Sequence, residues 1–361
     1  MNLSLGIVGL PNVGKSTLFN ALTNNDVPAQ NYPFCTIDPN VGIVPVMDPR
    51  LDKLAELVRP AKVTPAVVEF WDIAGLVKGA ASGAGLGNKF LANIRNVSAI
   101  VHVVRAFENG NITHVENSVD PKRDIDLINS ELILKDIETV SDKVKFMDGR
   151  ARADRKLQPQ LDFLLALEKH LNEGKLAKDI EVPNDEDIQE LFNSLFLLTS
   201  KPVIYVVNTD ASNAEANVSL VKQVINPGDM VVPMDIQLEF EISALPEPDK
   251  TQYLQELGMN EPTLAKLSRA AYDLLGLMSF FTAGEQEVRA WTITKGTKAP
   301  QAAGVIHTDF EKKFITADIV KCDDFLSAGG WVGAKEQGKV KLGGKDYVME
   351  DGDVVLFRHN A

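Results

Sequence analysis

The octapeptide GLPNVGKS, Gly9–Ser16, fits the pattern G-x-x-x-x-G-K-S, which is typical of loops that bind nucleotide phosphates. A short apolar run of β type precedes it at 3–8, and 17–22 has the composition of a helix. In this setting the loop N–H groups surround the phosphates, and the helix N-terminus adds positive partial charge. Lys15 would contact the β- and γ-phosphates, and the Ser16 hydroxyl would bind Mg²⁺. The stretch predicts an α/β nucleotide-binding domain at the start of the chain.

The composition sets bounds on the rest of the molecule. The chain has 361 residues, enough for two or three domains, and a formal net charge of −13. Such an acidic balance excludes polyanion binding along the whole chain and restricts nucleic-acid contacts to local patches. Cys35 and Cys322 lie far apart, so one disulfide is an alternative to the reduced, cytoplasmic chain that we expect. No basic leader and no bilayer-length apolar run are visible, so no membrane partner is expected.

Two later segments supply the other groups that a nucleotide switch needs. Thr36 is the candidate for a second hydroxyl on Mg²⁺, and Asp72 ends a strand in DIAG, 72–75, where it can hold Mg²⁺ through water. The backbone N–H of Gly75 can contact a γ-phosphate, and that contact is lost on hydrolysis. Leu76 stands where many GTPases have the glutamine that orients the attacking water. Hydrolysis must therefore use another group.

Four motifs together resemble the YchF/Obg-like ATPase family, and the resemblance covers essentially the whole chain. They are NYPFCTI at 31–37, DIAGLVKGA at 72–80, GLGNKFL at 85–91 and HVENSVDP at 114–121. The resemblance implies a Ras-like P-loop NTPase domain, an inserted α-helical coiled-coil hairpin and a C-terminal β-grasp (TGS) domain. It also implies a preference for ATP and an association with the ribosome, through its large subunit.

The expected boundaries follow from these three parts. Residues 1–122 and 200–277 are predicted to form the nucleotide domain, 123–199 the inserted helices and 278–361 the TGS domain. The last region alternates in a mostly β pattern and carries scattered lysines that are further candidates for RNA contact, with ordinary surface lysines as the alternative. These are Lys312, Lys313, Lys339, Lys341 and Lys345.

The chain offers a histidine in place of the missing glutamine. His114 ends the loop 109–114, and an imidazole can orient or deprotonate water. The resemblance points to the same residue, so the predicted catalytic set is Lys15, Gly75 and His114; a surface histidine, with water oriented by a partner's group, is the alternative. In some relatives an asparagine at the position of Asn12 helps to hold K⁺. We therefore predict Mg²⁺ as the cofactor and K⁺ as a further candidate.

The residues expected at the base are irregular. A GTPase places N-K-x-D at the end of the strand predicted at 201–210, whereas this chain has NTDA, Asn208 to Ala211. The lysine is absent and Asp210 stands one position early, so guanine specificity loses its physical basis. Ala211 also departs from the N-x-x-E that the resemblance implies. The Asn208 amide can still pair with the N6/N7 edge of a purine, which suits adenine. ATP is the expected nucleotide and GTP the alternative.

Further site residues are assigned by position or by resemblance. Phe107 and Thr209 would line the base, and Ser243-Ala244 in 241–245 resembles a strand end that closes the base pocket. The predicted phosphate-binding residues are Pro11, Asn12, Val13, Gly14, Lys15, Ser16 and Thr17. The predicted Mg²⁺ ligands are Ser16, Thr36 and Asp72.

Apolar residues at helical spacing predict two antiparallel helices between about 124 and 199. The first helix has an a/d seam that Gly149 interrupts, and leucines from 157 to 171 resume an apolar face. The seam consists of Ile133, Ile137, Val140, Val144 and Met147. The bend is locally basic, which makes it a candidate RNA contact, with a solvated hairpin end as the alternative. Its charged residues are Lys143, Lys145, Arg150, Arg152, Arg155 and Lys156 against Asp148 and Asp154.

Together these patterns predict a cytoplasmic, monomeric, ribosome-associated ATPase switch that regulates translation or a stress response. Slow intrinsic hydrolysis is expected, because no glutamine follows Gly75. Three alternatives stay open: a GTP-preferring GTPase, a nucleotide-gated scaffold that does not hydrolyse, and a P-loop kinase of a small molecule. The paired switch elements and the lack of a recognisable acceptor pocket disfavour the kinase.

Overall fold

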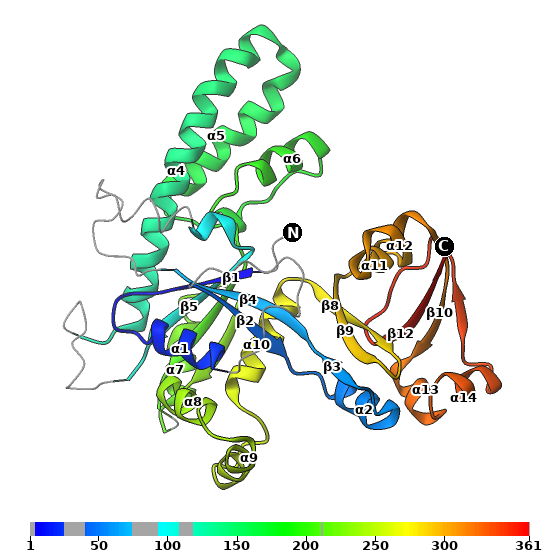
Figure 1. Cartoon of the computed structure of the whole chain (residues 1–361). Coiled ribbons are helices and arrows are strands. Elements are labelled where there is room, and N and C mark those ends of the chain that lie inside the picture. Colours follow the sequence, from blue (N-terminus) through cyan, green and yellow to red (C-terminus); the bar gives the residue numbers. More distant parts are fainter. Residues whose placement is uncertain (1–3, 25–39, 74–92, 108–117, 211, 361) are drawn as a thin grey trace. The chain divides into compact units, whose positions relative to one another are not determined.

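The computed structural model describes residues 4–24, 40–73, 93–107, 118–210 and 212–360 (Figure 1). By their contacts these residues form two compact units. The second unit contains 43–68 and 264–360, and the first contains the other described residues. Each unit combines a β-sheet with helices packed on its strands, as the predicted α/β fold requires.

The first sheet has six strands in the order β2-β4-β1-β5-β6-β7. Their bounds are β1 Ser4–Val8, β2 Val41–Val46, β4 Ala66–Asp72, β5 Ala99–Arg105, β6 Val203–Asn208 and β7 Met230–Met234. β1 pairs in parallel with β4 and β5, and β6 pairs in parallel with β5 and β7. All residues of β5 are buried, as expected for an inner parallel strand whose sequence is apolar apart from His102 and Arg105. Because the five strands β4, β1, β5, β6 and β7 are parallel, their carboxyl ends lie along one edge of the sheet.

Four helices of the first unit flank or follow these strands. They are α1 Lys15–Thr23, α7 Ala214–Lys222, α8 Ile236–Ser243 and α9 Glu247–Glu256. α1 packs against α8, and α7 packs against β6 and β7. Asp235 begins α8, since its carboxylate accepts a hydrogen bond from the backbone N–H of Leu238 at 3.0 Å. The carboxyl edge of the sheet is therefore bordered by the first turns of α1 and α8.

The insertion is a long helical hairpin, and Figure 1 shows its two main helices side by side. Its elements are α4 Pro121–Ala153, the 3₁₀ turn η3 Arg155–Leu157, α5 Gln158–Asn172, the 3₁₀ turn η4 Ala177–Asp179 and α6 Glu186–Ser194. Asp120 caps α4 by accepting from the N–H of Arg123, and Pro121 occupies its first turn. The predicted interruption at Gly149 is wrong. α4 continues to Ala153, because the exposed glycine leaves the helical hydrogen bonds intact and the turn begins only at the Asp154 cap.

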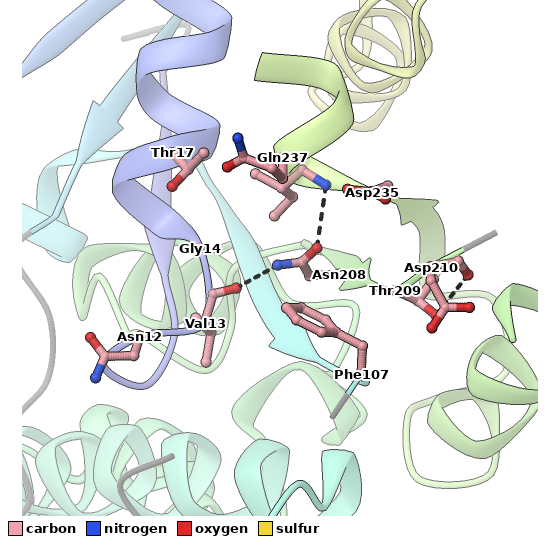
Figure 2. Close-up of a pocket in the computed structure, with 11 residues that line it drawn as sticks. Asn12, Val13, Gly14, Thr17, Phe107, Asn208, Thr209, Asp210, Asp235 and Gln237 are labelled. Atoms are coloured by element: carbon pink, nitrogen blue, oxygen red, sulfur yellow. Dashed lines mark hydrogen bonds between the residues drawn. The ribbon is translucent and has the colours of Figure 1, made fainter. Parts of the chain in front are cut away.

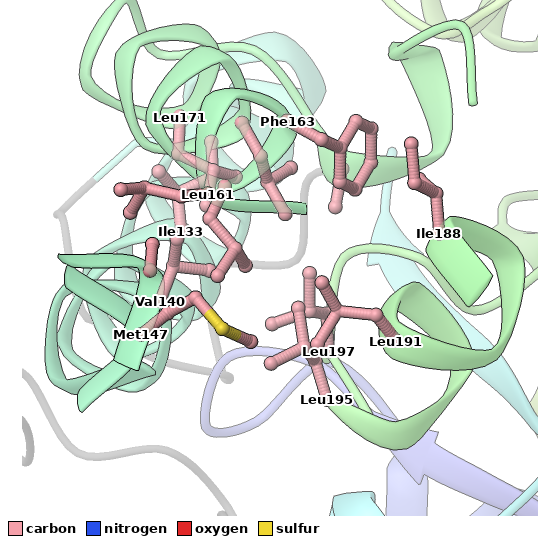
Figure 3. Packing of buried hydrophobic residues seen from close by; sticks show 14 residues of the cluster. Ile133, Val140, Met147, Leu161, Phe163, Leu171, Ile188, Leu191, Leu195 and Leu197 are labelled. Carbon is pink, nitrogen blue, oxygen red and sulfur yellow. The ribbon is translucent and has the colours of Figure 1, made fainter. Parts of the chain in front are cut away.

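The predicted seam forms the core of this hairpin (Figure 3). Val140 of α4 and Leu164, Leu167 and Leu171 of α5 are fully buried. Ile137 and Val144 are partly buried against the same cluster. A buried carboxylate joins α4 to the returning chain. Both oxygens of Asp136 accept hydrogen bonds, from the backbone N–H groups of Leu198 and Thr199 and from the Thr199 hydroxyl, at 2.6 to 2.8 Å.

The second unit contains a mixed sheet in the order β11-β10-β12-β8-β9-β3. Its strands are β3 Lys62–Thr64, β8 Leu277–Ala283, β9 Glu287–Thr294, β10 Phe314–Lys321, β11 Lys341–Gly343 and β12 Asp353–His359. Its helices are α2 Pro49–Val58, α10 Thr263–Leu274, α11 Ala299–Ile306, α12 Thr308–Lys312, α13 Cys322–Ser327 and α14 Trp331–Glu336, of which α10 begins at the last residue of the first unit. The mostly β module predicted after residue 278 is present, and its identification as a TGS domain stays a prediction.

Residues 43–68 group with the second unit, although the predicted boundaries assign them to the nucleotide domain. The reason is that β3 pairs in parallel with β9, and the Thr64 hydroxyl donates to Glu287 at 2.6 Å. Helix α2 also packs on β8 and β9. The domain boundaries themselves stay predictions. Among the described residues, no helix combines the length and apolar character that a membrane span requires.

Candidate nucleotide-binding site

The predicted phosphate-binding loop joins β1 to α1 within the first unit. Gly14, just before α1, has φ of +108°, a conformation that favours glycine. A Cβ at this position would lie 2.8 Å from Nδ2 of Asn208 and 3.2 Å from Cδ1 of Ile236. Asn12 has φ of +61°, in the left-handed region that asparagine tolerates better than most residues. Both conformations and the close approach to Asn208 explain why asparagine and glycine occupy these two positions of the loop.

Lys15 lies inside the loop rather than in solvent. Its side chain is buried, and Nζ donates to the carbonyl of Leu10 at 2.7 Å. The register of β1 and β4 places Asp72 opposite Ile7, beside the start of the loop. Burial lowers the pKa of Lys15 and raises the pKa of Asp72, and in each case the charge of the other group opposes the shift. The structure therefore brings the predicted lysine and carboxylate together.

The predicted Mg²⁺ ligands come from separate elements. Ser16 is exposed in the first turn of α1, and Asp72 ends β4. A hydroxyl and a carboxylate fit Mg²⁺, which takes a few protein oxygens together with phosphate oxygens and water. The third predicted ligand, Thr36, lies outside the described residues. The same is true of two predicted catalytic residues, Gly75 and His114, and of Ala211 in the base motif.

A cavity of about 580 Å³ adjoins the loop at the carboxyl edge of the sheet (Figure 2). This edge is where open α/β sheets bind ligands. The lining of the cavity comes from the loop and α1, from the end of β6 and from the segments that follow β5, β6 and β7. The lining residues are Asn12, Val13, Gly14, Thr17, Phe107, Asn208, Thr209, Asp210, Asp235, Ile236 and Gln237. Residues of the phosphate loop and of the base motif, which lie far apart in the sequence, thus border one cavity.

The Asn208 side chain links two segments that line this cavity. Nδ2 donates to the carbonyl of Val13 at 2.9 Å, and Oδ1 accepts from the N–H of Ile236 at 3.3 Å (Figure 2). A second amide was not anticipated from the sequence: Nδ2 of Asn217 donates to the Ala106 carbonyl and to the Thr209 hydroxyl, each at 2.7 Å. Asn217 therefore joins the residues that follow β5 and β6, whereas Asn208 joins the end of β6 to the phosphate loop and to α8. Part of the hydrogen-bonding capacity predicted for base recognition is used within the protein.

Two carboxylates line the described cavity, and both are engaged in local turns. Asp210 accepts from the hydroxyl of Ser212 and from the backbone and side-chain nitrogens of Asn213, at 2.5 to 3.1 Å. These hydrogen bonds lower the pKa of Asp210, so the group is an ionised acceptor. Asp235 caps α8. The acids that could recognise guanine N–H groups already have donors.

Phe107 is the aromatic residue of the cavity, and a buried arginine fixes its position. The Arg105 guanidinium carbon lies 4.7 Å from the centroid of the Phe107 ring. Nε of Arg105 donates to the Phe107 carbonyl at 3.1 Å. Arg105 is 1% exposed and ends β5. One face of the ring is thus supported by the protein, and Figure 2 shows the ring beside Asn208 in the cavity.

The assignment of Ser243-Ala244 to a strand end is wrong. Residues 236–243 form helix α8, and Ser243 lies in its last turn. The Ser243 hydroxyl donates to the Phe240 carbonyl and accepts from Asn24, and neither Ser243 nor Ala244 lines the described cavity. The strand preceding α8 is β7, so 235–237 occupy the predicted place. The β-branched run of β7 followed by a capping aspartate was the signal that could have located them.

Comparison with known proteins agrees with this arrangement. The family model described as a 50S ribosome-binding GTPase matches residues 4–136. The model of the YchF GTPase C-terminal region, described as a protein of unknown function, matches residues 277–360. A solved structure of the Schizosaccharomyces pombe YchF GTPase has a TM-score of 0.88 and 39% identity, covering 99% of this chain and 98% of that chain.

Curated relatives match over the full length. The ribosome-binding ATPase YchF of Bacillus subtilis is 51% identical, with 100% of both chains covered. Obg-like ATPase 1 of Rattus norvegicus is 46% identical, with 100% of this chain and 93% of the relative covered. With a P-loop on the first sheet and a YchF-type C-terminal region, the chain belongs to the YchF/Obg-like ATPase family.

Proposed function

We propose that this chain is a Mg²⁺-dependent ATP hydrolase that acts as a nucleotide switch on the ribosome. Membership of the family supports NTP hydrolysis at the P-loop and ribosome binding as its coarse function. The base is a separate question, because the Bacillus subtilis relative is named an ATPase and the Schizosaccharomyces pombe structure a GTPase. The choice between ATP and GTP therefore depends on the residues that this chain places at the base.

The engagement of both cavity carboxylates carries the proposal of ATP. Guanine recognition in P-loop proteins uses a carboxylate that accepts from N1–H and the 2-amino group. Asp210 already accepts from Ser212 and Asn213, so guanine N–H groups would compete with these hydrogen bonds, and the bond from the first turn of α8 to Oδ1 fixes the direction of the Asp235 carboxylate. Adenine makes no such demand, and a ring on Phe107 can stack on either purine.

The chemistry assigned to the loop begins with a change of partner at Lys15. Its ammonium group would exchange the Leu10 carbonyl for the β- and γ-phosphates. The negative charge of these phosphates would favour the ammonium form of Lys15, which burial disfavours. The N–H groups of the first turn of α1 and the loop would hold the remaining phosphate oxygens. This electrostatic stabilisation grows as charge develops on the leaving group. The loop is thus proposed to bind the phosphates and to accelerate their hydrolysis.

Mg²⁺, held by Ser16, Thr36 and Asp72, would supply positive charge to the β- and γ-oxygens. Gly75 is proposed to contact the γ-phosphate through its N–H, and His114 to orient the attacking water. K⁺ beside Asn12 remains a proposal for additional charge. Rates of phosphate release in KCl and NaCl, with His114→Ala as the variant, test these two roles. Rapid turnover that is unchanged by His114→Ala and by the cation would remove both.

Equilibrium binding of ATP and GTP in the presence of Mg²⁺ is the decisive experiment on the base. We expect tighter ATP binding, with Asp210→Ala changing ATP affinity little because this carboxylate serves its own turn. Asp235→Ala is a matched variant that removes the other acid. Tighter GTP binding, lost in Asp210→Ala, would reassign the nucleotide to GTP and leave the phosphate site unchanged.

Ribosome binding is tested by cosedimentation with purified ribosomes and their separated subunits, in ATP, ADP and no nucleotide. We expect large-subunit binding that depends on the nucleotide. Leu76 keeps a second candidate, a nucleotide-gated scaffold without hydrolysis. Bound ATP recovered intact after long incubation with ribosomes would favour that scaffold. Sedimentation of the free chain tests the predicted monomer in the same experiment.

A further inference from the structure

The last turns of α4 expose an aromatic side chain between two cations. Phe146 is 58% exposed, although its neighbour Met147 is 4% exposed and belongs to the hairpin core. Lys143, Phe146 and Arg150 are spaced i, i+3 and i+7, so they lie on one face of the helix. The Lys143 Nζ and the Arg150 guanidinium carbon lie 5.9 and 5.6 Å from the ring centroid. We call this face, Lys143, Phe146, Gly149 and Arg150, the tip stripe.

The charges around the tip stripe are unequally distributed. Lys145 pairs with Asp142 and Arg152 pairs with Asp148, at 3.2 and 2.6 Å, on neighbouring faces of the helix. Within the described part of the chain, Lys143 and Arg150 form no ion pair of this kind. Residues 142–156 contain six cations and three carboxylates in a chain of net charge −13. The stripe is therefore a cationic site on an acidic protein, where a polyanion is attracted locally.

Gly149 has no packing reason to be glycine. A Cβ at this position would meet no atom within 4 Å, and the residue is exposed in a continuous helix. Glycine is less favourable than alanine inside a helix, so its presence has a cost that the fold does not require. It stands three residues after Phe146, where a longer side chain would lie over the approach to the ring. The absence of a side chain keeps one side of the ring open.

We propose that the tip stripe binds an unpaired segment of ribosomal RNA, with one base stacked on Phe146 and flanking phosphates on Lys143 and Arg150. An aromatic ring between cations is the chemistry that binds single-stranded nucleic acid. Paired RNA hides its base faces, which selects an unpaired loop or bulge. The proposal rests on the ribosome binding proposed above, and it assigns one contact within that interaction.

Two binding experiments test the tip stripe on the full chain. The first measures affinity for purified ribosomes, and the second measures fluorescence anisotropy with a short unpaired oligoribonucleotide and with an RNA duplex of equal length. Phe146→Ala is expected to weaken ribosome and single-strand binding by roughly 5- to 150-fold, the range for losing one stacked base. Phe146→Trp should retain binding. Leu134→Ala removes another exposed apolar residue of α4, 52% exposed, and should change nothing.

Gly149→Leu separates binding from folding. Leucine is the better helix former, so the melting temperature should rise or stay constant while RNA affinity falls, because the side chain covers the ring. Normal ribosome affinity of both Phe146→Ala and Gly149→Leu would overturn the tip stripe and leave the proposed function standing. Full affinity of Phe146→Leu would indicate an apolar contact with a ribosomal protein and would overturn the assignment to RNA. Absence of ribosome binding by the unmodified chain would instead refute the proposed partner.

Discussion

Replacing Phe107 by alanine removes the one aromatic ring of the described cavity and should weaken ATP binding. Arg105 covers one face of this ring at 4.7 Å, so a single face is left for a base. Stacking of one base on one aromatic ring contributes about 1–3 kcal/mol by alanine substitution. This corresponds to a roughly 5- to 150-fold increase in the dissociation constant.

Calorimetric titration with ATP and with inorganic tripolyphosphate isolates this contribution. Tripolyphosphate carries the charges that bind to the loop but has no base. Phe107→Ala should therefore weaken ATP and leave tripolyphosphate within about twofold, since no stacking energy is involved. Phe107→Trp should preserve ATP affinity. Removing the cation from beneath the ring with Arg105→Met should weaken ATP less than Phe107→Ala, and the double variant should be less than additive because the two residues are in contact.

Equal losses for ATP and tripolyphosphate would refute the reasoning, because they would place the effect at the phosphate loop. Unchanged affinity for both ligands in Phe107→Ala would also refute it, because the ring could then not contact a bound base. A loss confined to ATP in Phe107→Ala with no coupling to Arg105 would leave the stacking role intact and remove the supporting role of the arginine.

Three further predictions, two of them with a matched control substitution, test other parts of the structure. Burial lowers the pKa of His102 to about 3 in the folded chain. On acidification the unfolded chain therefore binds a proton at this histidine near pH 6.5, whereas the folded chain does not bind it until about pH 3. The free energy of unfolding should fall by about 1.4 kcal/mol per pH unit on acidification from ~6.5 toward ~3, and denaturant titrations of His102→Gln should lack this component. Gly14→Ala should destabilise by about 1–3 kcal/mol of strain and abolish ATP binding, whereas Gly174→Ala, at φ of +78° with open space around it, should bring strain without loss of binding. Leu164→Ala in the hairpin core should cost about 2–5 kcal/mol in denaturant titrations, and the exposed Leu165→Ala less than about 0.5.

Local patterns predicted most of the elements because they are decided locally. The apolar run of β5 and the seam of α4 have the period of the structures that they form, and the loop Gly9–Ser16 combines a strand, a turn and a helix start in one stretch. The interruption expected at Gly149 did not occur because packing of Met147 before it and Ala151 after it in the hairpin core outweighs the small helix penalty of one glycine. The placement of 43–68 depends on pairing between β3 and β9, residues more than two hundred positions apart, and no local pattern contains that information.

The base-binding end of the site shows a second limit of prediction from the sequence. Asn208, Asp210 and Asp235 are all residue types that could recognise a purine, and the sequence contains each of them at or near the carboxyl end of a strand. Recognition depends on which donors and acceptors stay available after folding. Asn208 donates one N–H to the Val13 carbonyl and accepts from the Ile236 N–H. Asp210 and Asp235 each accept from a backbone N–H of the turn that follows them. We expect the supported aromatic face of Phe107 and the rest of the Asn208 amide to accept adenine without breaking any of these bonds. Base preference in this chain therefore depends on the hydrogen bonds already formed within the protein, which a position-by-position comparison with N-K-x-D does not contain.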